Sequence, residues 1–163
     1  MNKNRALHHY QEGLFSAISV GFCLLLIGIL FAINPNLFDN ILAFFKDFKL
    51  VDVPNTNIVL PAPEFPFLHV PVYQASEQFS IAVTVLQVII LALRFVIPSS
   101  LRKKAETVGG LVYWGGTSFL IQSFLIDKAS VSIMYWFEFW ALIIVLAGIS
   151  ILARAAVMAV SRM

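Results

Sequence analysis

Residues Leu14–Ile33 read LFSAISVGFCLLLIGILFAI, twenty consecutive residues without a charge. A helix needs about 20 such residues to cross the hydrocarbon core of a bilayer. Backbone groups in lipid must satisfy one another, so an unbroken apolar run predicts a helix rather than a strand. Three further runs, Phe79–Ile97, Val108–Ile126 and Val131–Val160, are also apolar and long enough, although Arg94 lies in the first of them and Glu138 and Arg154 lie in the last. We therefore expect one all-α membrane domain, a bundle of four transmembrane helices.

The composition of the whole chain agrees with a membrane protein. Of its 163 residues, 60% are hydrophobic and 12% charged, with a mean hydropathy of +0.86, whereas soluble domains carry about 25% charged residues. The net charge of +2 and the lack of a Lys/Arg stripe exclude a nucleic-acid binder. A single cysteine excludes an intrachain disulfide and a zinc site built from cysteines. The expected partner is the lipid bilayer.

The basic residues indicate an orientation. Three lysines, Lys46, Lys49 and Lys128, lie on the side that holds the loop after the first predicted helix. Because loops rich in Lys and Arg stay in the cytoplasm, we expect a multi-pass protein of the cell membrane with both termini cytoplasmic. The seven basic residues on the predicted cytoplasmic side are Lys3, Arg5, Arg102, Lys103, Lys104, Arg154 and Arg162.

Residues 34–78 form the only long connection and are expected to make a cap on the outer face. Asn36 can cap the start of an amphipathic helix of about four turns. Pro54–Pro71 then holds five of the seven prolines and predicts extended or polyproline structure. This apolar segment could cover its own helices, meet a partner or second copy, or close over a substrate. The apolar cap residues are Phe38, Ile41, Leu42, Phe45, Phe48, Phe65 and Phe67.

Polar residues inside the predicted spans are candidate functional residues, because burying them in lipid is costly. One face of the predicted helix Phe79–Ile97 carries four of them, Ser80, Thr84, Gln87 and Arg94. We expect that face to point into the bundle. Glu138 lies within Tyr135–Trp140, so it could be an interfacial residue of an aromatic belt, a proton carrier or a subunit contact. Arg94 is placed to reach the inner interface, and Gln87 would reach Glu138 if their helices adjoin. The set is Ser80, Thr84, Gln87, Arg94, Gln122 and Glu138.

Small residues recur on the first and third predicted helices. Lipid gives no hydrophobic drive for helix association, so small residues that allow close backbone approach mark packing faces. We expect these two helices to pack on each other within the chain, with packing between subunits as the alternative. The residues are Ala17, Gly21, Gly28 and Ala32 on the first helix, and Gly109, Gly110, Gly115 and Gly116 on the third.

The sequence contains no signature of catalysis or of a cofactor. It lacks H-E-x-x-H, G-x-S-x-G, C-x-x-C and phosphate-binding glycine loops. His69 with Glu64 or Glu77 could meet on the outer face, but nothing fixes their geometry. We therefore expect no enzyme, cofactor or metal site. The expected function is a structural or accessory subunit of a homo-oligomer or larger membrane complex. The alternative is a small ion or solute pore or transporter that uses Ser80, Thr84 and Gln87 with Glu138.

Overall fold

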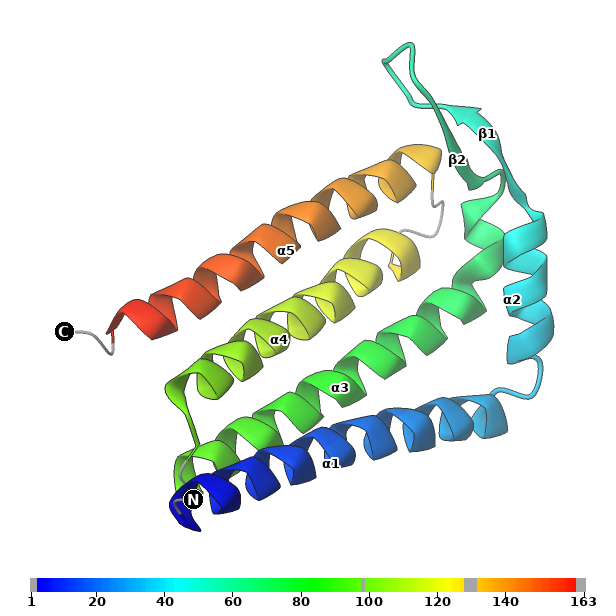
Figure 1. The fold of residues 1–163 in the computed structure, drawn as a ribbon. Helices are drawn as coiled ribbons and strands as arrows, with labels where there is room; N and C mark the ends of the chain where they lie inside the picture. Colours follow the sequence, from blue (N-terminus) through cyan, green and yellow to red (C-terminus); the bar gives the residue numbers. More distant parts are fainter. Residues whose placement is uncertain (1–2, 98, 128–131, 161–163) are drawn as a thin grey trace.

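The computed structural model describes residues 3–97, 99–127 and 132–160, with side chains except at 3–12, 14 and 160. Four long helices of the described chain lie side by side in one row, in the order α1, α3, α4, α5 (Figure 1). The row is open, because α1 and α5 occupy its two edges. The helices are α1 (Lys3–Ile33), α3 (Val70–Val96), α4 (Leu101–Leu120) and α5 (Ile133–Val160), and the π-helical segment η2 (Ile121–Ile126) continues α4.

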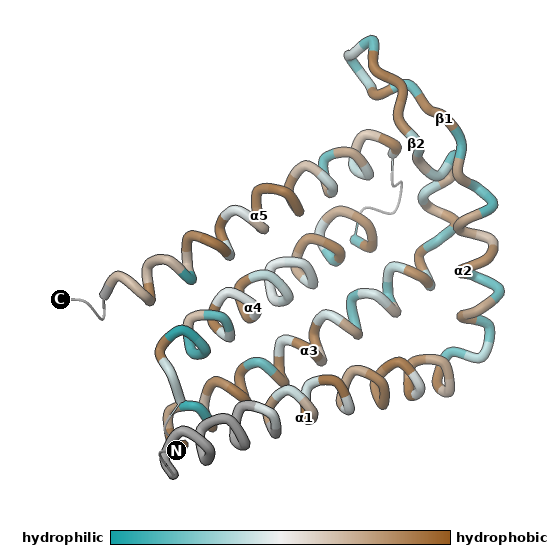
Figure 2. The backbone as a smooth tube through the Cα atoms, viewed as in Figure 1, coloured by the Kyte–Doolittle hydropathy of each residue, from teal (hydrophilic) through white to brown (hydrophobic). Residues whose placement is uncertain are grey.

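Three helices of the described chain are long and apolar enough to cross a membrane: Phe15–Ile33, Pro66–Val96 and Ile133–Ala159. This supports a membrane-embedded protein. The predicted crossing Val108–Ile126 is not among them. Its helix, α4, starts with charged residues and is nearly white along its middle, where α1 and α5 are brown (Figure 2).

Three helices begin earlier than the hydropathy of the sequence predicts. α1 is already helical at Lys3 rather than from Leu14. α3 starts at Val70 rather than Phe79, with Pro71 in its first turn, where the missing N–H of proline costs nothing. α4 starts at Leu101 rather than Val108, and the backbone N–H of Lys103 donates to the Ser100 carbonyl at 3.0 Å. Polar and charged residues in the first turns of α1 and α4, and from the second turn of α3 onward, hid these starts. The predicted first residue of the last helix, Val131, lies outside the described residues.

The cap, residues 34–69, contains a short helix and a β-hairpin. The helix, α2 (Leu37–Lys46), is shorter than the predicted four turns, and Asn36 precedes it without a side-chain capping bond. Phe48, predicted in the helix, begins the strand β1 (Phe48–Asp52). β1 pairs antiparallel with β2 (Val59–Pro63), and the 3₁₀ turn η1 (Pro66–His69) leads into α3. The expectation of a purely helical chain is therefore wrong in the cap.

The hairpin accommodates prolines because both of its strands are edges. Pro61 and Pro63 lie in β2 and have no N–H to donate, which only an edge strand tolerates. The turn places Asn55 at φ 62°, a left-handed conformation that asparagine adopts more readily than most residues. The N–H of Val53 donates to the carbonyl of Ile58 at 2.8 Å and closes the turn. Extended structure was predicted here, but not its pairing.

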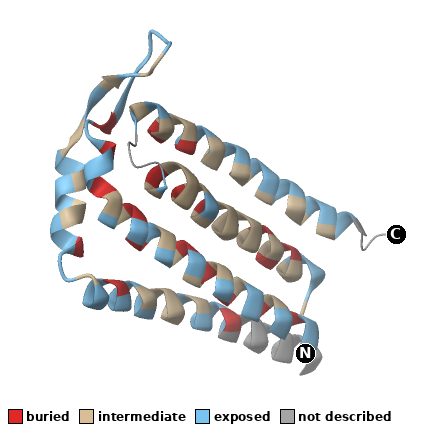
Figure 3. Ribbon diagram, turned by 180° about the vertical axis from the view of Figure 1, so that it is seen from behind, coloured by how far each residue is buried: buried red, intermediate tan, exposed pale blue. Residues whose placement is uncertain are grey.

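The largest buried cluster joins the cap to the ends of the helices. Phe44 of α2 contacts the rings of Phe48, His69, Tyr73 and Trp136, with centroids 5.1–6.1 Å apart. These rings come from α2, β1, η1, α3 and α5, so they hold five elements together. Away from this end, exposed residues follow the outer faces of α1 and α5 (Figure 3). The buried members of the cluster are Ala62, Tyr73, Ile121, Leu125, Trp136 and Phe139.

Candidate functional site

The polar residues of α3 lie in its contact with α4. Ser80 is fully buried and donates to the Ser76 carbonyl at 2.8 Å, and Thr84 donates to the Ser80 carbonyl at 2.8 Å. The side chains of Thr84 and Gln87 lie 3.5 Å and 3.3 Å from where a Cβ would stand at Gly115 and Gly110. The predicted polar face therefore packs on glycines of α4.

The opposite face of α4 meets α5 through its other glycines. A Cβ at Gly116 would overlap the side chain of Leu146, whose Cδ2 would be 2.7 Å away. At Gly109, a Cβ would stand 2.6 Å from Cδ of Arg154. The Ser150 hydroxyl also donates to the Gly109 carbonyl at 2.8 Å. Glycines on both sides thus let α4 approach α3 and α5 closely.

The predicted packing of the first helix against the third within the chain is wrong. α1 packs on α3, which lies between α1 and α4. A side chain at Gly21 or Gly28 would meet nothing within 4 Å, and Ala17 and Ala32 are exposed. The small residues of α1 therefore face away from the rest of the described chain, and packing between subunits remains as their predicted alternative.

We expect Ser150→Ala to lower the free energy of unfolding by about 0.6 kcal/mol, the mean measured for hydrogen bonds between membrane helices. The reason is the loss of the only hydrogen bond described between the α4 backbone and an α5 side chain. Thermal unfolding in detergent measures the change. Ser118→Ala is the matched control, because Ser118 donates within α4, to Gly115. Equal shifts for both variants would contradict a role for the bond between the helices.

The remaining polar candidates lie apart from one another. Gln122 donates to the carboxylate of Asp127 at the end of η2. Arg94 is buried, with its guanidinium 5.3 Å from the ring centroid of Phe15 in α1. Glu138 is half-buried near the start of α5. Gln87 was expected to reach Glu138 only if their helices adjoined, and α4 lies between α3 and α5, so this condition is not met.

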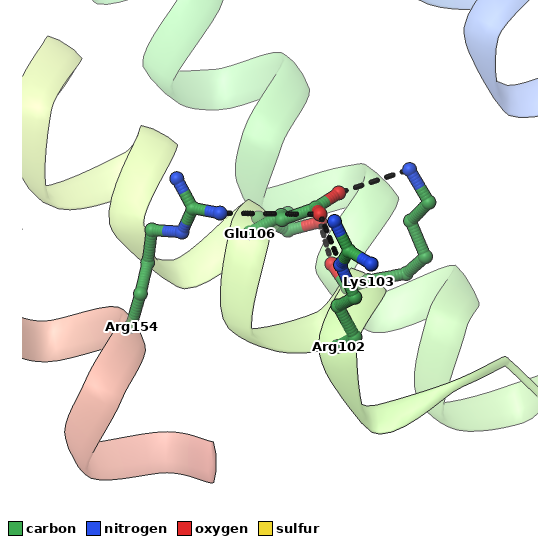
Figure 4. A network of polar contacts seen from close by, with 5 residues as sticks. Arg102, Lys103, Glu106 and Arg154 are labelled. Atoms are coloured by element: carbon green, nitrogen blue, oxygen red, sulfur yellow. Dashed lines mark hydrogen bonds and ion pairs between the residues drawn. The ribbon is translucent and has the colours of Figure 1, made fainter. Parts of the chain in front are cut away.

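An ion cluster joins α4 to α5 at the end of the row away from the cap (Figure 4). The Glu106 carboxylate contacts Lys103 Nζ at 2.9 Å, Arg102 Nε at 3.3 Å and Arg154 Nη2 at 3.9 Å. The hydrogen bond from Lys103, more than any other effect, lowers the pKa of Glu106. Glu106 was not among the residues predicted from the sequence, although its spacing of four and three residues from Arg102 and Lys103 predicts such ion pairs.

We expect Glu106→Gln to lower the free energy of unfolding by less than about 1 kcal/mol at neutral pH, because the carboxylate is partly exposed. Since folding lowers the pKa of Glu106, its contribution is present above the ordinary value of 4.5 and is lost as pH falls through the lowered value. Denaturation midpoints of both proteins should therefore converge in acid. A difference that persists below about pH 3 would contradict the ionic origin.

A second polar cluster fixes the base of the hairpin. Asp47 Oδ2 accepts from the Phe65 N–H at 2.9 Å and lies 2.9 Å from His69 Nε2. The Asp47 carbonyl accepts from the Glu64 N–H at 3.0 Å, and Glu64 pairs with Lys49 across the strands. Burial raises the pKa of Asp47, but the bonds from Phe65 and His69 outweigh it and lower that pKa. His69 thus bonds Asp47, and no group of three metal-binding side chains occurs among the described residues.

Most of the predicted apolar cap residues lie on the surface. α2 turns Leu37, Ile41 and Phe44 toward the protein, and Phe48 is half-buried beside them. The face of α2 next to the one that packs on the protein is not covered by the described chain. The residues around the start of η1 are not covered by it either. The exposed residues are Phe38, Leu42, Phe45, Phe65 and Phe67 of the predicted set, and Leu50, Ile58, Val59 and Leu60 of the hairpin.

No protein-family model, no curated protein and no solved structure matches this chain. Its function is therefore argued from the arrangement of its own residues.

Proposed function

We propose that this chain is a membrane protein of four spans that serves as a non-enzymatic structural subunit of a homo-oligomer or larger membrane complex. The proposal rests on the open row of helices, which leaves the small-residue face of α1 without a partner among the described residues. In membranes such faces are where helices associate most closely.

That face of α1 has the shape of a helix-packing surface. Gly21, Gly28 and Ala32 alternate with Leu24, Leu25 and Ile29 along an open groove of about 490 Å³. From Gly21 to Ala32 the groove follows α1 for roughly 16 Å, about three helical turns. A membrane helix of a second copy is the occupant that we propose.

The fourth span would be α4 with η2. The chain is uncharged from Thr107 to Ile126, twenty residues, which is long enough to cross. α4 lies between α3 and α5, so two helices shield it from lipid and its glycines and hydroxyls need not be apolar. This position accounts for its lower hydropathy without removing it from the membrane.

The arrangement of charge supports the proposed orientation. The first turns of α4, with Arg102, Lys103 and Lys104, lie at the end of the row where α1 begins and α5 ends (Figure 1). The cap lies at the other end. A cytoplasmic location for this basic end places both termini in the cytoplasm.

The alternative of a pore or transporter has less support. Its proposed path uses Ser80, Thr84 and Gln87, but Thr84 and Gln87 pack on glycines of α4 and Ser80 is buried. The hydroxyls of Ser80 and Thr84 already donate to carbonyls of α3.

The mass of the particle in mild detergent tests the proposal. We expect the wild type to contain at least two chains or a co-purified partner, and Gly28→Ile to release single chains because isoleucine fills the groove. Gly148→Ile is the matched control: Gly148 also faces open space, but on α5 and outside the groove. A wild type that is strictly monomeric and partnerless would overturn the proposal.

A further inference from the structure

An open cavity of about 380 Å³ lies between α1 and α4, in the half of the row nearer the cap. α3 forms its floor, and Ser80 is the residue of α3 that lines it furthest from the cap. Leu30 of α1 and Trp114 of α4 stand on either side, and Ile41 of α2 covers the end toward the cap. The volume falls within the range of small-molecule sites, roughly 300–1,000 Å³.

The lining of this cavity suits hydrocarbon. It carries no charged side chain, and its only polar side-chain groups are the hydroxyls of Ser76, Ser80 and Thr117 and the indole N–H of Trp114. Each of the three hydroxyls donates at 2.8 Å to a carbonyl one turn earlier in its own helix. Their hydrogens are therefore already used, so these hydroxyls offer no free donor to a polar ligand.

A polar pocket of about 190 Å³ adjoins the cavity on the side of the cap. Its wall includes Asn34, Asn36 and Asn40, and Leu37 lines both spaces. On α1 and α3 the lining residues of the pocket lie nearer the cap than those of the cavity. The two spaces are therefore stacked along the helices, with the polar one outward.

We propose that the two spaces together bind one phospholipid, with an acyl chain in the cavity and the glycerol ester and phosphate region at the three asparagines. Asn34 donates to the Leu30 carbonyl at 3.0 Å and keeps its own oxygen free, whereas carboxamides such as those of Asn36 and Asn40 offer both donors and acceptors. Because no cation lines the pocket, it suits a zwitterionic headgroup such as phosphatidylcholine.

A helix of another subunit does not fit this site. Along α3 the cavity extends from Val72 to Ser80, roughly 12 Å, whereas a crossing helix is about 30 Å long. α2 also covers its outer end. A flexible acyl chain that enters sideways from the bilayer meets neither obstacle.

The test uses the full chain in phosphatidylcholine vesicles that contain phosphatidylcholine with a diazirine near the end of one acyl chain. After illumination, mass spectrometry should find adducts concentrated on the cavity residues, such as Phe79 and Trp114. Ser76→Leu fills the cavity from the exposed side of α3, and we expect it to lower these adducts about tenfold, or about 1.4 kcal/mol. Ser16→Leu, on the exposed face of α1, should leave them unchanged.

The polar pocket is tested by native mass spectrometry of the detergent-solubilised protein. We expect one retained phosphatidylcholine per chain, lost in Asn40→Leu and kept in the hairpin variant Asn57→Leu. Adducts spread evenly over the exposed faces of α1 and α5, or unaffected by Ser76→Leu, would overturn the proposal. So would labelling by a photoreactive free fatty acid but not by the phospholipid. The site lies within one chain, so these outcomes are independent of the mass of the assembly.

Discussion

Gly116→Ile is expected to separate α4 from α5 and to prevent a stable fold. The side chain of Leu146 occupies the space into which a Cβ at Gly116 would point. Overpacking by a few carbons costs about 1–3 kcal/mol when neighbours can adjust, and isoleucine adds four where α4 and α5 are in close contact. Since whole domains are stable by only 5–15 kcal/mol, a loss of about 3 kcal/mol or more should be visible as low yield and aggregation. Size-exclusion chromatography after heating measures it.

Two variants make this prediction specific. Gly148→Ile makes the same change on the exposed side of α5, where nothing lies within 4 Å, and should leave the melting temperature nearly unchanged. Gly116→Ala combined with Leu146→Ala restores the space and should be more stable than Gly116→Ala alone. If Gly148→Ile is as damaging as Gly116→Ile, the cause is the loss of helical glycine and not the contact between the helices.

The sequence predicts the edge helices of the row best. α1 and α5 each have a neighbour on one side of the row, and their long apolar runs predict them as helices. α1 ends at Ile33 as expected, although it begins at Lys3 rather than Leu14, and α5 is helical to Val160, the last described residue. α4 begins with Arg102, Lys103 and Lys104, and these charges hid its start. α3 carries Gln74 and Glu77 in its second and third turns, which a search for apolar runs excludes.

The cap is the part that the sequence predicts least. The prolines of β2 favour polyproline as much as a strand, and only pairing with β1 decides between them. The contact of Asp47 with His69 joins residues 22 positions apart, which no local spacing reveals. The small residues of α1 and of α4 look alike in sequence, yet within the described part of the chain only the glycines of α4 have close neighbours on another helix. Pattern identifies a packing face but not its partner.

Asp47→Ala is expected to release the hairpin from the helices. The substitution leaves the Phe65 N–H and the buried His69 without the acceptor that joins them to the end of α2. The loss of two hydrogen bonds to a charged group, which leaves both of its partners without an acceptor, costs about 2–4 kcal/mol. This is a local cost, so amide exchange over residues 48–69 should accelerate about 30-fold or more while exchange in α5 stays unchanged. Hydrogen–deuterium exchange with mass spectrometry resolves the two segments.

The control and the pH dependence identify the carboxylate as the cause. Asp52→Ala removes an exposed carboxylate at the other end of β1 and should leave exchange unchanged. Because folding lowers the pKa of Asp47, its contribution is present above the ordinary value of 3.8 and is lost as pH falls through the lowered value. In acid, after correction for intrinsic exchange, the wild-type hairpin should therefore approach the rate of Asp47→Ala. A hairpin that stays protected in Asp47→Ala at neutral pH would mean that the aromatic contacts of Phe44, rather than this carboxylate, hold the cap on the helices.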